Sequence, residues 1–352
     1  MREISSAAWV VNSRARRRTL GEFELDLLVD SVMDSYAIEE EHLSRDSVRS
    51  SFIRAFWPSR QTLKPGDTQT RALAELYREL WKNAEEDLTH EVLHRWHEAL
   101  IAPDDVAYSL RELRRGAYRT SAQPIQVVSR GDRVHFEAPP AAALHREMAL
   151  FLDWVNTPAS ALELNPWLKL AYAHLWFLTL HPYDDGNGRM ARVLSDWMMM
   201  RMQTPSRALV SMTGSIQAQR EAYYEHLEQA QRGGVVIDDW CAWFLERAEA
   251  SFVDAGKRWD RSLERTRKTS IFWKKYSPSD FSPEQRKLVE RLLQGGDQDF
   301  PDGITRRQYK SLAGVSDTTA TKHLQLLVEL GVLRTTGQMK STRYQLNSDI
   351  FL

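Results

Sequence analysis

The amino-acid sequence predicts a mainly α-helical fold, because apolar residues recur at helical spacing through most of the 352 residues. The first helical pattern places six apolar side chains on one face: Leu25, Leu28, Val29, Val32, Met33 and Tyr36. The composition, with 42% apolar and 27% charged residues, is ordinary for a globular protein with a packed core. Residues 125–137 depart from the helical pattern.

Further helices are predicted in order along the chain at 69–82, 89–101, 140–156, 166–180, 188–202, 215–232 and 237–254. Between the second and third of these, two apolar runs at 125–129 and 134–137 flank Arg130-Gly131-Asp132-Arg133, which predicts a β-hairpin with a short turn. Pro139-Pro140 then ends the strand and opens the next helix. Because a lone hairpin is not stable by itself, we expect it to lie on the helical body.

The C-terminal part changes in character. Residues 257–276 are rich in Lys and Arg and predict a charged helix that ends in a linker at Ser277-Pro278-Ser279. A solvated helical face is favoured there over a nucleic-acid-binding patch. A helix follows at 283–293, and a capping box at Thr305–Gln308 with a glycine stop at Gly314 marks a second one. A third helix begins at Ser316, and we expect its apolar positions to point inward: Ala320, Leu324, Leu327 and Leu330. Strand-like residues at 332–334 and 342–346 complete an order that resembles a winged helix-turn-helix.

Composition excludes several classes of protein. Lys plus Arg is 47 and Asp plus Glu is 48, so the overall charge indicates no polyanionic partner. Cys241 is the single cysteine, which excludes a disulfide within the chain, and its apolar neighbours predict a buried thiol. No apolar stretch is long enough to span a bilayer, and the N-terminus has no signal-peptide pattern. We therefore expect a cytoplasmic protein without a membrane partner.

Residues 181–192 carry the strongest chemical signal. Gly186-Asn187-Gly188 opens a helix, and exposed N–H groups at a helix N-terminus attract anions. Arg189 and Arg192 are three residues apart and can serve one anion on the same face. Asp185 offers a hard oxygen ligand for Mg²⁺, and His181 can take a proton near neutral pH. The combination predicts phosphoryl or nucleotidyl transfer.

The same string, His181-Pro182-Tyr183-Asp184-Asp185-Gly186-Asn187-Gly188-Arg189 with Arg192, resembles the Fic family motif, with Tyr183 in place of the usual Phe. We treat this replacement as mild because the ring is kept. Gly116-Ala117-Tyr118-Arg119, the hairpin and Ala138-Pro139-Pro140 are similar to the segment that precedes the Fic core. Tyr223 and Tyr224 resemble aromatic residues that shape the family's nucleotide pocket, although core packing explains them equally well.

The resemblance implies a reaction and its residues. His181 would deprotonate a Ser, Thr or Tyr hydroxyl of a target protein, which attacks the α-phosphate of ATP. Asp185 would hold Mg²⁺, while Gly186, Asn187 and Gly188 bind the α-phosphate and Arg189 and Arg192 bind the outer phosphates. The hairpin is similar to the family's flap, which docks an extended target segment by strand addition. The docking residues would be Ile125, Gln126, Val127 and Val128.

The first helix ends in a second motif. Ser35 and Glu39 resemble the inhibitory pattern Ser/Thr-x-x-x-Glu-Gly/Asn of many Fic proteins, and Glu40 departs from it. The resemblance implies that Glu39 pairs with Arg192 and denies this arginine to the γ-phosphate.

Four segments are expected: an inhibitory helical domain at 1–87, a Fic core at 88–250, a charged helix and linker at 251–279, and a winged helix at 280–352. Two other functions stay open: the same fold with another nucleotide donor, and a DNA-binding regulator with a nucleotide-sensing core. The second would use six residues of the winged helix: Thr318, Thr319, Lys322, Gln325, Lys340 and Arg343. The oligomeric state, a homodimer included, is also open.

Overall fold

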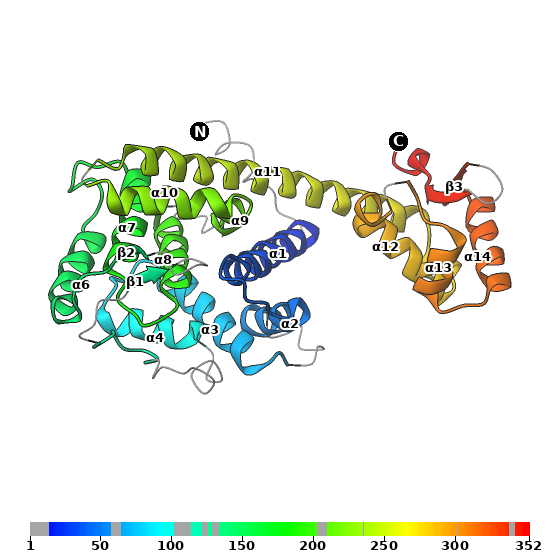
Figure 1. Cartoon of the computed structure of the whole chain (residues 1–352). Helices are drawn as coiled ribbons and strands as arrows, with labels where there is room; N and C mark the ends of the chain where they lie inside the picture. Colours follow the sequence, from blue (N-terminus) through cyan, green and yellow to red (C-terminus); the bar gives the residue numbers. More distant parts are fainter. Residues whose placement is uncertain are drawn as a thin grey trace. The chain divides into compact units, whose positions relative to one another are not determined.

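The chain is mainly helical, as predicted (Figure 1). The computed structural model describes residues 14–57, 65–101, 114–121, 126–128, 134–202, 210–234, 236–300, 302–337 and 342–352, with the backbone alone at 14–20, 22, 126–128, 134–135 and 296–299. The chain divides into two compact units. One is Gly21–Gly256, and the other combines Met1–Leu20 with Lys257–Leu352. We call them the motif unit and the C-terminal unit.

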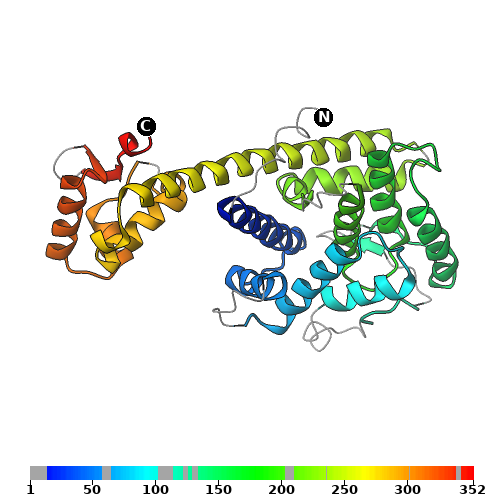
Figure 2. The same cartoon turned by 180° about the vertical axis from the view of Figure 1, so that it is seen from behind.

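The motif unit contains most of the helices, which Figure 2 shows from behind. In order they are α1 (Arg14–Ile38), α2 (Arg45–Phe56), α3 (Thr68–Lys82), α4 (His90–Leu100), α6 (Ala141–Asn156), α7 (Pro166–Leu180), α8 (Asn187–Met202), α9 (Thr213–Gln217), α10 (Arg220–Arg232) and α11 (Asp238–Lys275). The division between the units falls within α1 and within α11.

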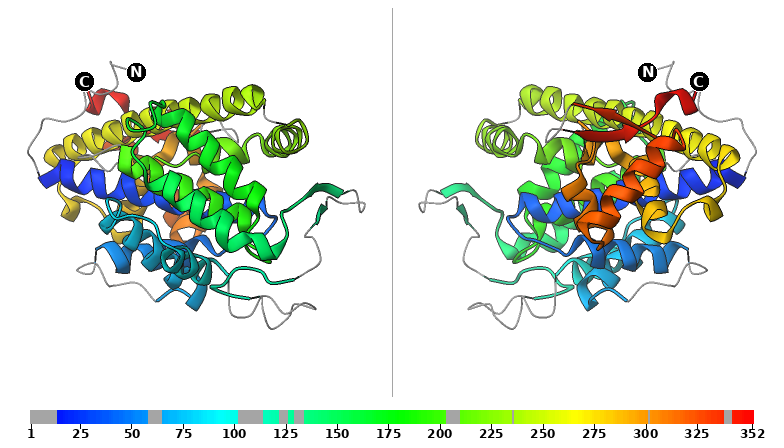
Figure 3. Two further views of the ribbon diagram at one scale, coloured as in Figure 1. Left: turned by 90° about the vertical axis from the view of Figure 1, so that its left-hand side faces the viewer. Right: turned by 90° about the vertical axis from the view of Figure 1, so that its right-hand side faces the viewer.

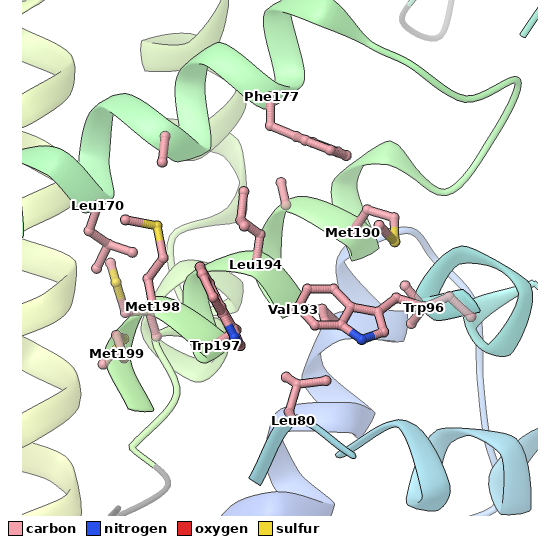
Figure 4. Close-up of a cluster of buried hydrophobic side chains, with 14 of the residues drawn as sticks. Leu80, Trp96, Leu170, Phe177, Met190, Val193, Leu194, Trp197, Met198 and Met199 are labelled. Carbon is pink, nitrogen blue, oxygen red and sulfur yellow. The ribbon is translucent and has the colours of Figure 1, made fainter. Parts of the chain in front are cut away.

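Helix α8 lies at the centre of the motif unit's core. Figure 4 shows its side chains between Phe177 and Leu170 of α7 on one side and Trp96 of α4 on the other. The Trp96 and Trp197 rings are 6.3 Å apart between centroids, and both are 2% exposed. Removing such a ring typically costs about 3–5 kcal/mol. The packing therefore holds α8, and with it the arginines of its first turns, in one position.

The predicted hairpin is present. Strands β1 (Gln126–Val128) and β2 (Val134–Glu137) pair antiparallel, with Val127 opposite Phe136. Ile125 lies outside the described residues. Figure 3 shows the hairpin projecting from the helical body of the motif unit. Among the described strands β1 pairs with β2 alone, so its other edge presents unpaired backbone groups.

The C-terminal unit has its own core. After the last turns of α11 come η2 (Pro278–Asp280), α12 (Pro283–Asp299), α13 (Arg306–Ala313), α14 (Asp317–Glu329), β3 (Leu333–Thr336), β4 (Arg343–Leu346) and η4 (Ser348–Ile350). The Thr305–Gln308 capping box and the left-handed stop at Gly314 (φ 68°) are confirmed. Apolar side chains of these elements, Phe272 and Leu288 among them, form one cluster.

Three of the four inward positions of α14 are confirmed, since Ala320, Leu324 and Leu327 are 0% exposed. The prediction for Leu330 is wrong: its side chain is 42% exposed because α14 ends at Glu329 and Leu330 follows as the C-cap residue.

The residues suggested for nucleic-acid contact lie on the same unit. Thr318, Lys322 and Gln325 are exposed on α14, and Thr319 is half-buried. Arg343 is half-buried and donates to the Gly303 carbonyl at 3.3 Å. Lys340 lies outside the described residues. The winged-helix assignment, these contacts and the four predicted segment boundaries stay predictions.

Three predicted elements differ from the structure. The segments 237–254 and 257–276 belong to one helix, α11, because the residues between them do not end the helix. The predicted helix at 215–232 is divided into α9 and α10 around Ala218 and Gln219. Helix α2, which begins after the N-cap Ser44, was not predicted. Cys241 is free and buried as expected, and a membrane-spanning helix is absent from the described residues.

Candidate active site

Helix α7 ends at His181, the candidate base. His181 has left-handed backbone angles (φ 46°, ψ 58°), and its N–H donates to the Phe177 carbonyl at 3.0 Å. Such a conformation is uncommon for a residue other than glycine. Arg119 helps to hold it: its Nε donates to the His181 carbonyl at 2.8 Å, and its backbone N–H donates to the Pro182 carbonyl at 3.0 Å. The chain therefore leaves α7 in a fixed direction.

The electrostatic surroundings keep the imidazole neutral. Burial lowers the pKa of His181 to about 4, and a hydrogen bond with the Leu178 backbone opposes the shift. At pH 7 the ring is unprotonated and can accept a proton.

The loop between α7 and α8 is closed by its own side chains. The Asn187 amide accepts from the Tyr183 N–H at 3.0 Å and donates to the Tyr183 carbonyl at 2.9 Å. One amide hydrogen of Asn187 is left for another acceptor. Gly186 has φ 75°, and a Cβ there would lie 2.7 Å from Ile101 Cδ1. Glycine is required at this position for both reasons.

The Tyr183 ring packs against α4 and supports the loop. The Tyr183 ring is 0% exposed and stacks on His97, with centroids 3.9 Å apart and an interplanar angle of 6°. Its hydroxyl is hydrogen-bonded to His94 Nδ1 at 3.2 Å. The replacement of Phe by Tyr is therefore not neutral in this chain, because a buried hydroxyl needs a partner and His94 supplies it. His94 and His97 were missed in the sequence analysis, since helical spacing alone does not show which side chains meet a distant loop.

The start of α8 has the features of an anion site. Arg189 and Arg192 are 1% and 2% exposed, beside the first residues of the helix. Arg189 Nε and Arg192 Nη1 are buried and have no hydrogen-bond partner among the described residues. Buried guanidinium donors without a partner, next to a helix N-terminus, suit a phosphate group.

Asp185 is the candidate Mg²⁺ ligand. Its side chain is 52% exposed, one oxygen accepts from the Gly186 N–H at 2.7 Å, and the other lies 3.4 Å from Arg189 Nη2. No cluster of three or more metal-binding side chains occurs in the described part of the chain. A lone exposed carboxylate beside a phosphate site nevertheless fits Mg²⁺, which usually binds through one or two carboxylates together with substrate phosphates.

The end of α1 reaches this site. Arg192 donates through Nε to Ser35 Oγ at 2.9 Å and through Nη2 to Glu39 Oε1 at 2.8 Å. Burial raises the pKa of Glu39, but Arg192, Arg189 and the Tyr224 hydroxyl together outweigh burial and hold the pKa below its ordinary value. Glu39 approaches Gly188 so closely that a Cβ at residue 188 would collide with its carboxylate. Ser35, Glu39 and Arg192 are thus brought together in the way the sequence predicts.

Two further ion pairs at this end of α1 were missed. Glu41 Oε2 lies 2.8 Å from Arg189 Nη1, and Glu40 Oε1 lies 3.1 Å from Arg220 Nη1. The run of three glutamates at 39–41 is visible in the sequence. The partner Arg220 is not, because the contact joins residues 180 positions apart.

The two candidate pocket tyrosines occupy different places. Tyr223 is 1% exposed, and its hydroxyl is hydrogen-bonded to His174 Nε2 at 3.0 Å among core tryptophans. Tyr224 is 38% exposed, and its hydroxyl lies 3.4 Å from Glu39 Oε2. Tyr224 therefore faces the candidate site, whereas Tyr223 supports the core behind it. The flap residues Gln126, Val127 and Val128 form β1.

Comparison with known proteins agrees with this geometry. Residues 87–199 match the sequence model of the Fic/DOC family. The chain is 34% identical over 98 residues to a protein adenylyltransferase Fic of Nematostella vectensis. This match covers 28% of this chain and 21% of that protein. The chain is 38% identical over 82 residues to protein adenylyltransferase fic-1 of Caenorhabditis elegans, covering 23% and 15%. The chain thus spans about a fifth or less of the length of these relatives.

A solved structure supports the fold. Fic-1 from C. elegans superposes with a TM-score of 0.50 at 21% identity, covering 73% of this chain and 68% of that one. The matched sequence segment includes α4, α6, α7 and the whole 181–192 motif. Through this segment, residues 87–199, the chain is similar to the Fic/DOC family.

Proposed function

We propose that the chain transfers AMP from ATP to a hydroxyl side chain of a target protein, and that Glu39 restrains the reaction. The observation that carries the proposal is the occupation of Arg192 by Glu39 at an anion site beside a neutral histidine. The names of the relatives, protein adenylyltransferases, support the same reaction.

The reaction assigns one role to each group. His181 takes the proton of the incoming hydroxyl, whose oxygen forms a bond with the α-phosphorus of ATP. The bond from the α-phosphorus to the bridging oxygen breaks, and pyrophosphate leaves with the electron pair. Because His181 is neutral at pH 7, no prior deprotonation is needed.

The anion site positions the nucleotide. The Gly188 N–H and the second amide hydrogen of Asn187 bind the α-phosphate, and the Gly186 N–H joins them once it is released from Asp185 Oδ1. Arg189 and Arg192 bind the outer phosphates. Asp185 would hold Mg²⁺, which would neutralise phosphate charge. Positioning and electrostatic stabilisation then provide most of the rate.

The hairpin supplies the target-binding edge in this proposal. Backbone groups on the outer edge of β1, at Gln126–Val128, pair with an extended segment of the target and bring its hydroxyl toward His181. The residue type that receives AMP is a Ser, Thr or Tyr.

Restraint follows from competition for one guanidinium. While Arg192 is bound to Glu39 and Ser35, it cannot contact the γ-phosphate, and ATP binds without aligning its α-phosphate for attack.

The test uses labelled ATP and a Glu39→Gly variant. Loss of one partly buried ion pair should raise AMP transfer by roughly tenfold or more. His181→Ala in the Glu39→Gly background should abolish transfer and leave ATP binding nearly intact, and Arg192→Ala should lose activity in either background. If Glu39→Gly and the wild-type chain transfer AMP at the same rate, the restraint is disproved.

A further inference from the structure

Three consecutive glutamates at the end of α1 each contact a different arginine. Glu39 pairs with Arg192 at 2.8 Å, Glu41 with Arg189 at 2.8 Å and Glu40 with Arg220 at 3.1 Å. Two of these arginines belong to α8, and the third begins α10. One short segment thus engages cationic groups from two helices.

The backbone at Glu40 makes this arrangement possible. The Glu41 N–H donates to the Tyr36 carbonyl and the Glu40 N–H to the Ala37 carbonyl, which is the bonding pattern of a Schellman helix end. Glu40 occupies the position where this motif favours glycine, and its φ is 63°. A glutamate held in the left-handed region is strained, which points to a function for its side chain.

Arg220 is joined to the same site by more than its ion pair. Its Nε donates to the Ile38 carbonyl at 2.6 Å, so a cation meets the C-terminal end of α1. Its guanidinium lies 5.5 Å from the centroid of the Tyr224 ring, and the Tyr224 hydroxyl is 3.4 Å from Glu39 Oε2. Arg220 and Glu39 therefore border one site through Tyr224.

Charge and burial rank the three pairs. The side chains of Arg189 and Arg192 are 2% exposed, whereas that of Arg220 is 35% exposed. A buried guanidinium that loses its carboxylate gains most from a new anion, while an exposed pair contributes little. A guanidinium group that pairs with a carboxylate can pair with a phosphate group in the same way.

We propose that Glu39, Glu40 and Glu41 form an acidic plug that occupies three arginines in place of nucleotide phosphates, and that Arg220 is a third phosphate-binding arginine. The proposal rests on the adenylyl-transfer function above and extends its restraint from one glutamate to three. Displacing the plug requires that all three pairs separate.

The experiment compares Glu39→Gln, Glu40→Gln, Glu41→Gln and the triple variant of the full chain. Glutamine keeps the volume and removes the charge, and the three side chains are 28–48% exposed, so we expect the variants to fold. Glu75→Gln is the matched control, because Glu75 is an exposed partner of Arg78 on α3 outside the site. ATP affinity is measured by calorimetry and AMP transfer with labelled ATP.

Glu39→Gln and Glu41→Gln should each strengthen ATP binding and raise AMP transfer by about tenfold. Glu40→Gln should raise both by about twofold. The triple variant should exceed every single one. Arg220→Gln in the triple background should weaken ATP binding by about tenfold, since no glutamate then competes for the site.

Two outcomes separate the plug from the activity. If Glu39→Gln activates while Glu40→Gln and Glu41→Gln match Glu75→Gln, the plug is disproved and the proposed function stands. If Glu40→Gln and Glu41→Gln strengthen ATP binding but the triple variant transfers no AMP, the plug stands and the proposed activity fails.

Discussion

At the scale of single residues, His97 connects two segments that converge on the site. Its Nδ1 lies 3.0 Å from the Gly116 N–H, and its Nε2 lies 3.1 Å from the Asp185 carbonyl. A backbone N–H can only donate and a carbonyl can only accept, so Nδ1 is the acceptor and Nε2 carries the proton. His97 thus ties the segment before the hairpin to the loop that carries Asp185. We regard it as a positioning residue.

Replacing His97 by Phe keeps a ring on Tyr183 but removes both hydrogen bonds. We expect AMP transfer in the Glu39→Gly background to fall by about tenfold, because the Asp185–Gly186 backbone loses its support. The loss should appear in kcat and in the KM for ATP, measured beside the thermal melting temperature.

Two conservative variants provide the control. Gln reaches the position of Nε2 and can still donate to the Asp185 carbonyl, whereas Asn reaches only the position of Nδ1. His97→Gln should recover most of the activity and His97→Asn should not. Equal activity in both, at equal stability, would show that the bond to Asp185 has no part in positioning.

At the scale of elements, α1 and α8 meet through an antiparallel series of polar contacts. Ser31 Oγ donates to Asp196 Oδ2 at 3.5 Å, and Arg192 Nε donates to Ser35 Oγ at 2.9 Å. Glu39 lies against Gly188 at the other end. The contacts advance by four residues on each helix in opposite directions, so each helix uses one face. The position of Glu39 therefore depends on the whole interface.

Asp196 is the buried end of this series and predicts a pH dependence of stability. Burial raises its pKa to about 6, although the Tyr77 hydroxyl donates to it at 2.9 Å. The folded chain binds this proton more tightly than the unfolded chain. The resulting stability is present below the unfolded pKa of about 3.9 and is lost as the pH rises through 6.

An Asp196→Asn variant does not titrate at this position. We expect its free energy of unfolding in urea, relative to that of wild type, to increase as the pH is raised from 4 to 7. The asparagine side chain has one acceptor oxygen, whereas the aspartate side chain has two. At pH 4 the variant should therefore be less stable than wild type by about 1 kcal/mol. A difference that stays constant with pH would show that the pKa of Asp196 is the same in the folded and the unfolded chain.

At the scale of the whole molecule, the two units have separate hydrophobic clusters. All candidate catalytic, nucleotide-binding and inhibitory residues lie within Gly21–Gly256. The last turns of α11 belong with the C-terminal unit, since the Phe272 ring lies 5.9 Å from that of Phe281. A chain cut after Gly256 therefore leaves both clusters intact. A cut after Ser279 would separate Phe272 from Phe281.

A chain ending at Gly256 should keep AMP transfer and its activation by Glu39→Gly. We expect rates within about twofold of the full chain, because no candidate site residue is removed. Transfer with labelled ATP and circular dichroism check this result. A shortened chain that is folded but inactive would assign the C-terminal unit a part in catalysis.

The sequence by itself predicted the helical class, the positions of most helices and the 181–192 motif. These features depend on local spacing: a helix of period 3.6 shows its buried face, and glycines before an arginine pair mark an anion site. Ser35 and Glu39 were predicted from their resemblance to the inhibitory motif of Fic proteins.

The tertiary structure decided which distant groups meet. His97 contacts a residue 88 positions away, Glu41 one 148 away and Glu40 one 180 away. It also showed that Tyr223 lies in the core whereas Tyr224 faces the candidate site, and that His94 is the hydrogen-bond partner of the Tyr183 hydroxyl. Helical periodicity identifies the buried face but not its neighbour. Pairing across helices depends on how whole faces pack, and that is a property of the folded chain.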